Sequence, residues 1–206
     1  MKKLAFIILL ISIATLGFSQ GQVEISAFSG YTFKSEFNIS GGDCKVRDGY
    51  TGGMSLGFYV DDNYSIDIMY TRQRSQLRAQ SIFLDEVYRD NISINYILIG
   101  GNRLFTSIDD DFQPYGGIKI GAVIIDYTDP SQNQIVKFAA NANLGVKYYL
   151  SDVLGLKAGM NLSFPITDAG ASLGWSSGGG TSVGVSTWSP IAQFAFLGGI
   201  TVRLGN

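Results

Sequence analysis

Apolar and polar side chains alternate residue by residue along most of the chain. From Phe138 to Leu150 every second residue is apolar and most of those between are small or polar, and the segment from Leu154 to Phe164 repeats the pattern. Successive side chains of a β-strand point to opposite faces, so this period of two predicts strands with one apolar face each. Ser151 and Asp152 separate the two segments, which predicts a hairpin with a very short turn.

Six further segments show the same period, so the sequence predicts eight strands in all. These six are Val23 to Phe33, Tyr50 to Val60, Tyr64 to Gln73, Asn91 to Leu98, Tyr115 to Ile124 and Ala192 to Leu204. In the fourth of them, the even-numbered residues from Ile92 to Leu98 are assigned to the apolar face, and Asn91, Ser93 and Asn95 to the polar one.

The connections between these segments alternate strictly between short and long. In an up-and-down barrel, this order places all tight turns and both termini at one end and all long loops at the other. That asymmetry is typical of bacterial outer-membrane barrels. The short connections are 61–63, 106–112 and 151–152, and the long polar ones are 35–49, 75–90, 126–136 and 165–189.

The first residues have the pattern of a secretory signal peptide. Lys2 and Lys3 precede an apolar run that is too short to span a bilayer as a helix, and small residues follow it. We predict a signal peptide over residues 1–19 and a mature domain over residues 20–206, with an uncleaved anchor as the alternative. No later segment has the roughly 18 consecutive apolar residues of a membrane helix. A membrane-embedded mature chain must therefore be a closed barrel.

Composition agrees with a lipid-facing protein. Charged residues make up 16% of the chain, and 26 of the 206 residues are glycine, whereas soluble domains have roughly 25% charged residues. The net charge of -2 and the lack of a basic block argue against nucleic acid as a partner. The chain has no histidine, the usual general base and commonest metal ligand, so we expect no catalytic, cofactor or metal site. Cys44 is the single cysteine, and we expect a free thiol in a polar loop.

Two segments carry a resemblance to a known family. The stretch Pro114–Gly121 resembles the Pro-Tyr strand with alternating glycines of the eight-stranded outer-membrane β-barrel family, of OmpA/OmpX type, with its "outer membrane protein beta-barrel" domain. Gly198–Leu204 is similar to the terminal strand that the barrel-insertion machinery reads, although this chain ends on Leu204-Gly205-Asn206 and not on an aromatic residue. The resemblance implies insertion by that machinery into a Gram-negative outer membrane and contact with its lipids, but no particular activity.

The two faces of the strands indicate which side meets lipid. A face of Gly, Ser, Asn and Thr is a poor solvent face but suits the narrow lumen of an eight-stranded barrel, which side chains can fill. Because isolated charges in such a lumen are costly, we expect the inward charges to pair. Glu24 is expected beside Arg203, and Asp67 near Lys147 or Lys157. The full predicted lumen network is Glu24, Asp67, Lys119, Lys147, Lys157 and Arg203.

These features favour an all-β, eight-stranded antiparallel up-and-down transmembrane barrel that is monomeric and not an enzyme. We expect a plugged polar lumen and a structural or surface-interaction role, in which the long loops, especially Thr167 to Trp188, contact an extracellular partner. A narrow, porin-like transport pore is the main alternative. A secreted soluble lipocalin-like binding barrel and a histidine-free lipid enzyme are further alternatives.

Overall fold

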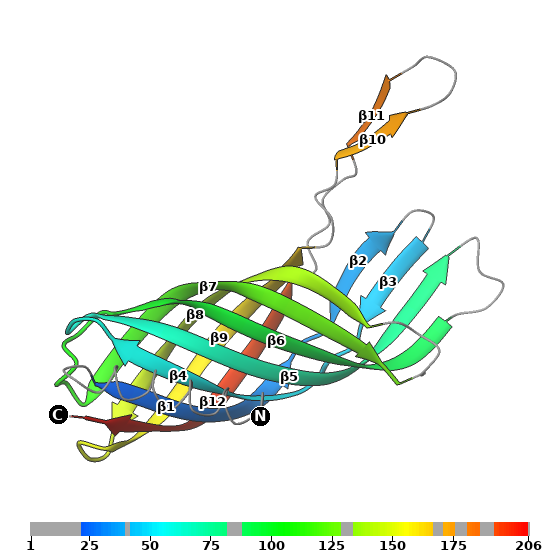
Figure 1. Ribbon diagram of the computed structural model, residues 1–206. Helices are drawn as coiled ribbons and strands as arrows, with labels where there is room; N and C mark the ends of the chain where they lie inside the picture. The colour runs from blue at the N-terminus through cyan, green and yellow to red at the C-terminus, as the bar shows by residue number, and fades with distance from the viewer. Residues whose placement is uncertain are drawn as a thin grey trace, which may run out of the picture.

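The chain forms a closed barrel of antiparallel strands in the computed structural model, which describes residues 22–39, 42–81, 88–128, 134–166, 171–175, 181–185 and 192–205 (Figure 1). The predicted signal peptide, residues 1–19, lies outside the described residues. Eight strands make the wall: β1 Val23–Thr32, β4 Gly49–Tyr59, β5 Tyr64–Ser81, β6 Tyr88–Leu104, β7 Phe112–Tyr127, β8 Ile135–Tyr149, β9 Leu154–Ile166 and β12 Gln193–Leu204. Within the described residues, no helix is long and apolar enough to cross a membrane.

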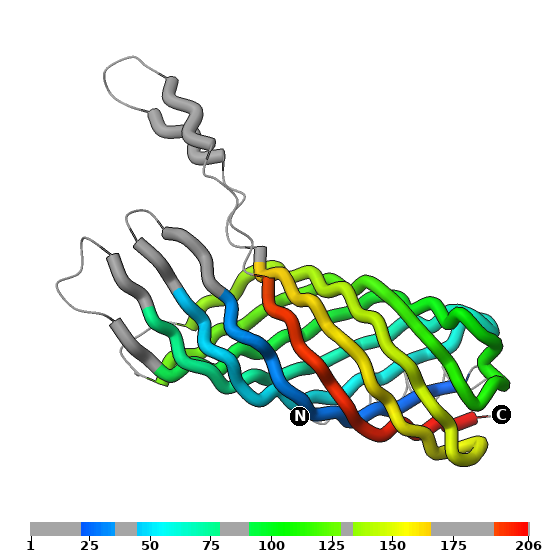
Figure 2. The backbone as a smooth tube through the Cα atoms, turned by 180° about the vertical axis from the view of Figure 1, so that it is seen from behind, coloured from blue at the N-terminus to red at the C-terminus, as the bar shows by residue number. Residues whose placement is uncertain are grey.

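The barrel closes between its first and last strands. Strand β1 pairs with β12 in antiparallel register, from Val23 opposite Leu204 to Thr32 opposite Ala195. Every other wall strand pairs with its sequence neighbours in the wall, and Figure 2 shows the tilted strands running around one cylinder. Because the wall is closed, every backbone N–H and C=O group in it can find a hydrogen-bond partner within the protein, as a lipid environment without water requires. The predicted up-and-down barrel is confirmed.

Short turns and long connections lie at opposite ends, but two of the long connections contain strands. The hairpin of β2 (Ser35–Ile39) and β3 (Gly42–Val46) occupies the segment expected to be a loop. Strand β3 continues the wall beyond the barrel by pairing with the outer end of β5, from Val46 opposite Leu77. Strands β10 (Ala171–Trp175) and β11 (Thr181–Val185) form a separate hairpin. Segments of five residues are too short for a period of two to stand out from polar surroundings.

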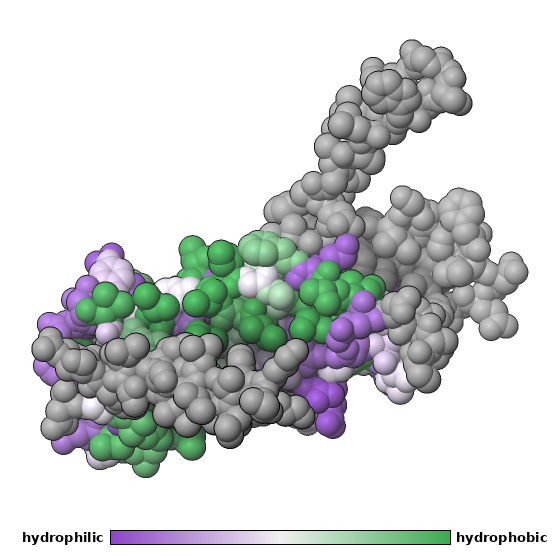
Figure 3. All heavy atoms as spheres, viewed as in Figure 1, coloured by the Kyte–Doolittle hydropathy of each residue, from purple (hydrophilic) through white to green (hydrophobic). Residues whose placement is uncertain are grey.

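Apolar side chains cover the outside of the barrel and small or polar ones fill the inside. On the outer wall, Ile118 is 69% exposed and Leu144 is 50% exposed, whereas the inward-facing Ser26 and Thr201 are fully buried. Figure 3 shows apolar residues along the visible wall and polar residues toward both ends. This orientation contradicts the alternative of a soluble lipocalin-like barrel, which would have its apolar face inside.

Strand β6 is the exception to the predicted facing. Its even-numbered residues from Ile92 to Leu98 lie inside the barrel, with Leu98 only 1% exposed, and Ile97 and Ile99 point outward instead. The predicted phase of this strand was therefore wrong. The reason is that both faces are apolar over its middle. The pairing with β5 fixes the phase, because Gly100 lies opposite the inward-facing Asp67.

Exposed aromatic residues lie near both ends of the wall. Tyr64, Phe105, Phe112 and Tyr148 are exposed at the end with the short turns. At the other end the rings of Tyr31, Phe33, Tyr50, Phe194 and Phe196 contact one another, with centroids between 5.0 and 5.9 Å apart. Such girdles mark the two membrane interfaces of outer-membrane barrels.

Substitution of Leu144 by arginine tests the lipid-facing wall. Leu144 lies four residues above the interface tyrosine Tyr148 on β8, which places it near the middle of the bilayer. An arginine there is expected to lower the free energy of unfolding by about 2–4 kcal/mol, because the cation leaves water for hydrocarbon. Val153→Arg, in the turn before β9, should cost less than about 1 kcal/mol. Urea titration of the barrel folded into vesicles measures both, and equal costs would contradict the depth assignment.

A pair of alanine substitutions tests the facing of β6. Leu98→Ala opens a cavity in the lumen and is expected to cost about 2–5 kcal/mol of unfolding free energy. Ile97→Ala changes a side chain that faces lipid and should cost about 1 kcal/mol, since lipid fills the space that it leaves. The same urea titration compares them. The reverse order of costs would mean that β6 has the phase predicted from sequence alone.

Candidate functional site: the lumen and the outer rim

The end of the lumen near the short turns is closed by an apolar cluster of Tyr59, Leu104, Ile108 and Tyr115. Ile108 belongs to the connection between β6 and β7, and this connection turns its side chain into the barrel. Gln113 fixes the turn, because its Nε2 donates hydrogen bonds to the carbonyls of Ile108, at 2.5 Å, and Asp110, at 2.8 Å. A turn that sequence reading treated as a polar connection therefore forms the floor of the lumen.

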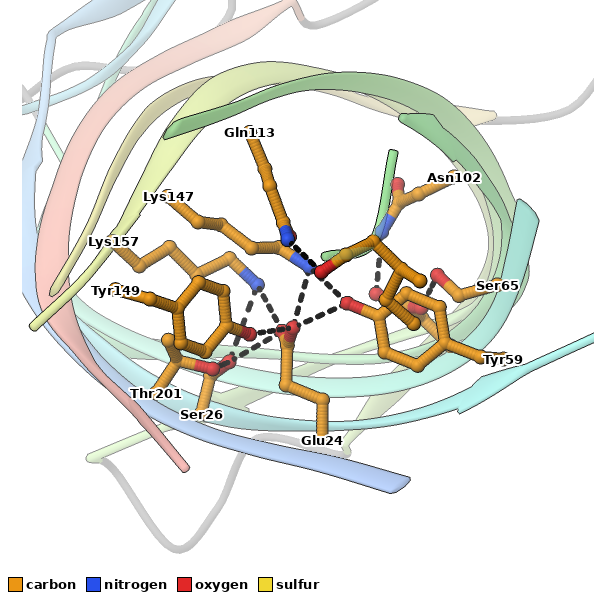
Figure 4. A network of polar contacts seen from close by, with 12 residues as sticks. Glu24, Ser26, Tyr59, Ser65, Asn102, Gln113, Lys147, Tyr149, Lys157 and Thr201 are labelled. Carbon is orange, nitrogen blue, oxygen red and sulfur yellow. Dashed lines mark hydrogen bonds and ion pairs between the residues drawn. The ribbon is translucent and has the colours of Figure 1, made fainter. Parts of the chain in front are cut away.

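Glu24 of β1 is the centre of the polar network above this floor (Figure 4). The Nζ of Lys147, on β8, lies 2.5 Å from its Oε2, and the hydroxyls of Tyr59 and Tyr149 donate to the same oxygen at 2.7 and 2.9 Å. Glu24 is 3% exposed and Lys147 is 1% exposed. A buried charge pair is tolerated when further hydrogen bonds satisfy its atoms, and these contacts supply them.

The other oxygen of Glu24 faces a second lysine. Lys157 of β9 lies 3.7 Å from Oε1, and the Ser26 hydroxyl donates to the same oxygen at 3.1 Å. Ser26 is also 3.1 Å from the Thr201 hydroxyl of β12. One carboxylate therefore binds groups from β1, β4, β8 and β9 and, through Ser26, reaches β12.

Asp67 of β5 is the centre of a neighbouring polar group. It accepts hydrogen bonds from Ser65 at 2.7 Å and from the amide of Asn102 at 2.5 Å, and the Nζ of Lys119 lies 3.8 Å away. Lys119 also donates to the side-chain oxygens of Asn102, at 2.8 Å, and Asn143, at 3.0 Å. The ammonium group therefore has two amide partners in addition to a longer ion pair.

The structure brings five of the six predicted lumen charges together, and Glu24 lies beside Arg203 as expected, but neither of the expected ion pairs forms. Arg203 lies opposite Glu24 in the strand register, yet its guanidinium lies over the Tyr149 ring, 3.9 Å from the ring centroid. Its Nε and Nη2 have no hydrogen-bond partner among the described residues. Likewise Asp67 pairs with Lys119, not with Lys147 or Lys157. Alternation tells which residues point inward, but not which ones meet across the lumen from strands that are not adjacent.

The outer half of the lumen combines an apolar cluster with buried polar side chains such as Thr51, Gln73 and Gln193, so the predicted polar interior is confirmed only in part. Tyr96 is anchored within this half by donating from its hydroxyl to Gln193 at 2.6 Å. Between this part and the ionic network lies a cavity of 20 Å³, which has room for about one water molecule. The buried members of the apolar cluster are Phe28, Val46, Met69, Ile92, Ile94, Tyr96, Leu98, Val123 and Ala139.

A second site lies on the outside of the rim, beside the outer ends of β5, β6 and β7. It is a polar cleft of 670 Å³, lined by three arginines, Arg47, Arg72 and Arg74, and two acids, Asp48 and Asp126. Sequence reading missed it because most of the residues that form it were assigned to the long loops. The sequence does contain a signal for this site. Arg72 and Arg74 follow Tyr70 at intervals of two, so a longer strand would place all three side chains on the outward face.

Hydrogen bonds hold the walls of this cleft. Arg47 donates to Gln76 at 2.9 Å, and Arg72 donates to Ser93 at 2.9 Å. Asp48 accepts a hydrogen bond from the Tyr31 hydroxyl, which holds the pKa of the Asp48 carboxyl below its usual value. The guanidinium groups are therefore partly oriented by neutral partners and keep donors that face the open side.

The described residues contain no group of three or more His, Cys, Asp or Glu side chains placed to hold a metal ion. We had expected Cys44 in a loop, but its backbone is part of β3. The side chain of Cys44 is not among those that the structure describes.

A closed eight-stranded wall with an apolar exterior and a filled interior defines an integral outer-membrane β-barrel protein. Residues 3–187 match the family model of the OprF membrane domain, so the chain belongs to that family. No curated protein matches the amino-acid sequence.

Solved structures of outer-membrane barrels share the fold. The N-terminal β-barrel domain of OprF from Pseudomonas aeruginosa is 16% identical, with a TM-score of 0.52 over 90% of this chain and 98% of that one. Neisserial surface protein A is 14% identical, with a TM-score of 0.57 over 91% and 100%. The outer membrane protein OprG from Pseudomonas aeruginosa is 11% identical, with a TM-score of 0.59 over 91% and 97%. At these identities the likeness shows the fold alone.

Replacement of Glu24 by glutamine tests the importance of the ionic network for stability. Glutamine keeps the shape but removes the charge, which leaves Lys147 buried without an ion partner, and we expect a loss of about 3–5 kcal/mol in unfolding free energy. Asp152→Asn, in the exposed turn between β8 and β9, removes the same charge at the surface and should cost less than about 1 kcal/mol. Urea titration in vesicles measures both, and a Glu24 variant as stable as the turn variant would rule out the network as a support of the barrel.

Proposed function

We propose that this outer-membrane barrel is a monomer that neither conducts ions nor catalyses a reaction, and that its role lies at the outer surface of the cell. The filled lumen carries this proposal. The floor of Tyr59, Leu104, Ile108 and Tyr115, the ionic network around Glu24 and the apolar cluster of the outer half follow one another along the barrel axis. Each would have to open for water or ions to pass.

The ionic network favours a plug over an ion path. A conducting lumen needs charged side chains that water can reach, whereas Lys119 and Lys147 are 2% and 1% exposed and hold fixed partners inside the barrel. Eight strands enclose a space that side chains can fill completely. The pore hypothesis therefore requires Glu24 and Lys147 to separate, and separation of a buried pair is costly.

The outer end offers surface for a partner. Strands β5 and β6 have 18 and 17 residues, whereas roughly 9–11 suffice to cross the bilayer, so they project beyond the barrel together with the β2–β3 hairpin. The predicted contact segment from Thr167 to Trp188 contains the separate β10–β11 hairpin. We propose that an extracellular partner binds this projecting end.

The two ends of the chain are proposed to direct export and membrane insertion. The apolar run at the start of the chain is proposed as a cleaved signal peptide, and β12 as the strand that the barrel-insertion machinery reads. A lipid enzyme remains the less favoured class, because the chain has no histidine to activate a serine. A changed acyl pattern of the cell's lipid A or phospholipids on overexpression would favour that class instead.

Planar bilayer recordings test the closed lumen. The purified barrel is expected to give no steady openings in potassium chloride, because the three filled parts of the lumen exclude ions. Arg103→Gln, on the outer wall near the short turns, is the matched control and should be equally silent. Steady openings whose amplitude rises with the salt concentration would contradict the proposal and support a narrow pore.

A further inference from the structure

The cleft at the outer rim has the position and the chemistry of a site for lipid headgroups. Its arginines lie on the outward face of the wall and not inside the barrel. Arg72 and Arg74 follow Tyr70 on β5 with the same outward phase, and the Tyr70 hydroxyl donates to the outward side chain of Asn95 on β6, at 3.0 Å. Below them Ile97 and Ile99 face the hydrocarbon.

The height of the cleft matches the outer headgroup region. Tyr64, at the aromatic girdle near the short turns, and Arg74 are both on β5. Arg74 comes ten residues after Tyr64, a rise of about 25 Å along a strand that is tilted by about 40°. The apolar band of outer-membrane barrels is also about 25 Å tall. Arg72 and Arg74 therefore lie where the hydrocarbon ends and lipid headgroups begin.

The cleft and the hollow next to it carry an excess of positive charge. Four arginines line them: Arg47, Arg72, Arg74 and Arg78. Among the residues whose side chains the structure describes, the acids that line them are Asp48 and Asp126. Both already accept hydrogen bonds from neutral groups, Asp48 from Tyr31 and Asp126 from Asn95 and Gln134. Asp48 also attracts the nearby Arg47. Guanidinium groups bind phosphate oxygens through two parallel hydrogen bonds, and three arginines against two acids leave the cleft with a net positive charge.

The backbone fixes the side of the cleft that Arg47 provides. The Arg47 amide donates to the Gln76 carbonyl at 2.9 Å, and the Ser75 hydroxyl donates to the Arg47 carbonyl. Gly49 follows, and a Cβ atom there would lie 2.0 Å from the Arg74 carbonyl oxygen, so only glycine permits this approach. The segment is thus attached closely to β5, which keeps Arg47 beside Arg72 and Arg74 without the ordering of a free loop.

Another part of the rim is aromatic. Around β1, β4 and β12 the same level carries the aromatic cluster of Tyr31, Phe33, Tyr50, Phe194 and Phe196. A site for a soluble polyanion would be expected at the projecting tips, whereas this cleft lies on the wall beside the lipid. We propose that Arg47, Arg72 and Arg74 bind the phosphate groups of an outer-leaflet glycolipid, whose acyl chains lie along the apolar wall below.

Native mass spectrometry of the detergent-solubilised barrel with added lipid A tests this site. The wild-type protein is expected to bind bisphosphorylated lipid A at least about tenfold more tightly than lipid A without its phosphates, as hydrogen bonds to a charged group imply. The double variant Arg72→Gln/Arg74→Gln should lose at least about tenfold in affinity for the phosphorylated form. Rising salt concentration should weaken the wild-type binding, because the site is exposed.

Arg103→Gln is the matched control, because this arginine is also on the outer wall but lies over the Tyr64 ring at the opposite end, 5.6 Å from its centroid. Its affinity for lipid A should stay within about twofold of wild type. Unchanged binding by the double variant, or equal binding of the two forms of lipid A, would overturn the proposal. Full competition by inorganic phosphate would also overturn it, by indicating a site for soluble anions. Conductance reports on the lumen alone, so either proposal can fail without the other.

Discussion

The structure depends on the pairing of β1 with β12, which closes the wall. In hydrocarbon, each backbone N–H and C=O group without a partner costs several kcal/mol, and a closed cylinder is the strand arrangement that leaves no edge. Closure also fixes two environments for side chains, because alternate residues must point to lipid or to the lumen. With eight strands the lumen is narrow, so the inward residues must fill it and satisfy one another.

The inward residues meet this demand in different ways along the axis. Near the short turns, Ile108 folds into the barrel and packs with Tyr59, Leu104 and Tyr115. In the middle, Glu24 binds Lys147 and Lys157, and Asp67 binds Lys119 through a shared set of amide groups. Farther out the interior is apolar around Leu98 and Met69. The interior thus resembles the core of a soluble protein, and the outside is adapted to lipid.

Sequence reading recovered the strands wherever the two faces differed in polarity. On β8, apolar residues such as Leu144 alternate with Asn143 and Lys147, and the structure agrees with the predicted facing. On β6, isoleucines occur on both faces, so only the pairing with β5 decides that Leu98 points inward. The ion pairs depend on how far a side chain reaches across the lumen. A period of two contains no information on that distance, and Arg203 was therefore assigned the wrong partner.

The central claim is that water does not reach the ionic network inside the barrel, and water-edited solid-state NMR of the lysine side chains in lipid bilayers tests it directly. Lys119 and Lys147 are buried in the lumen, whereas Lys34 is exposed at the rim. The expected result is slow transfer of magnetisation from water to the first two ammonium groups and rapid transfer to the third. Equally rapid transfer to all three would show a water-filled lumen and contradict the plug.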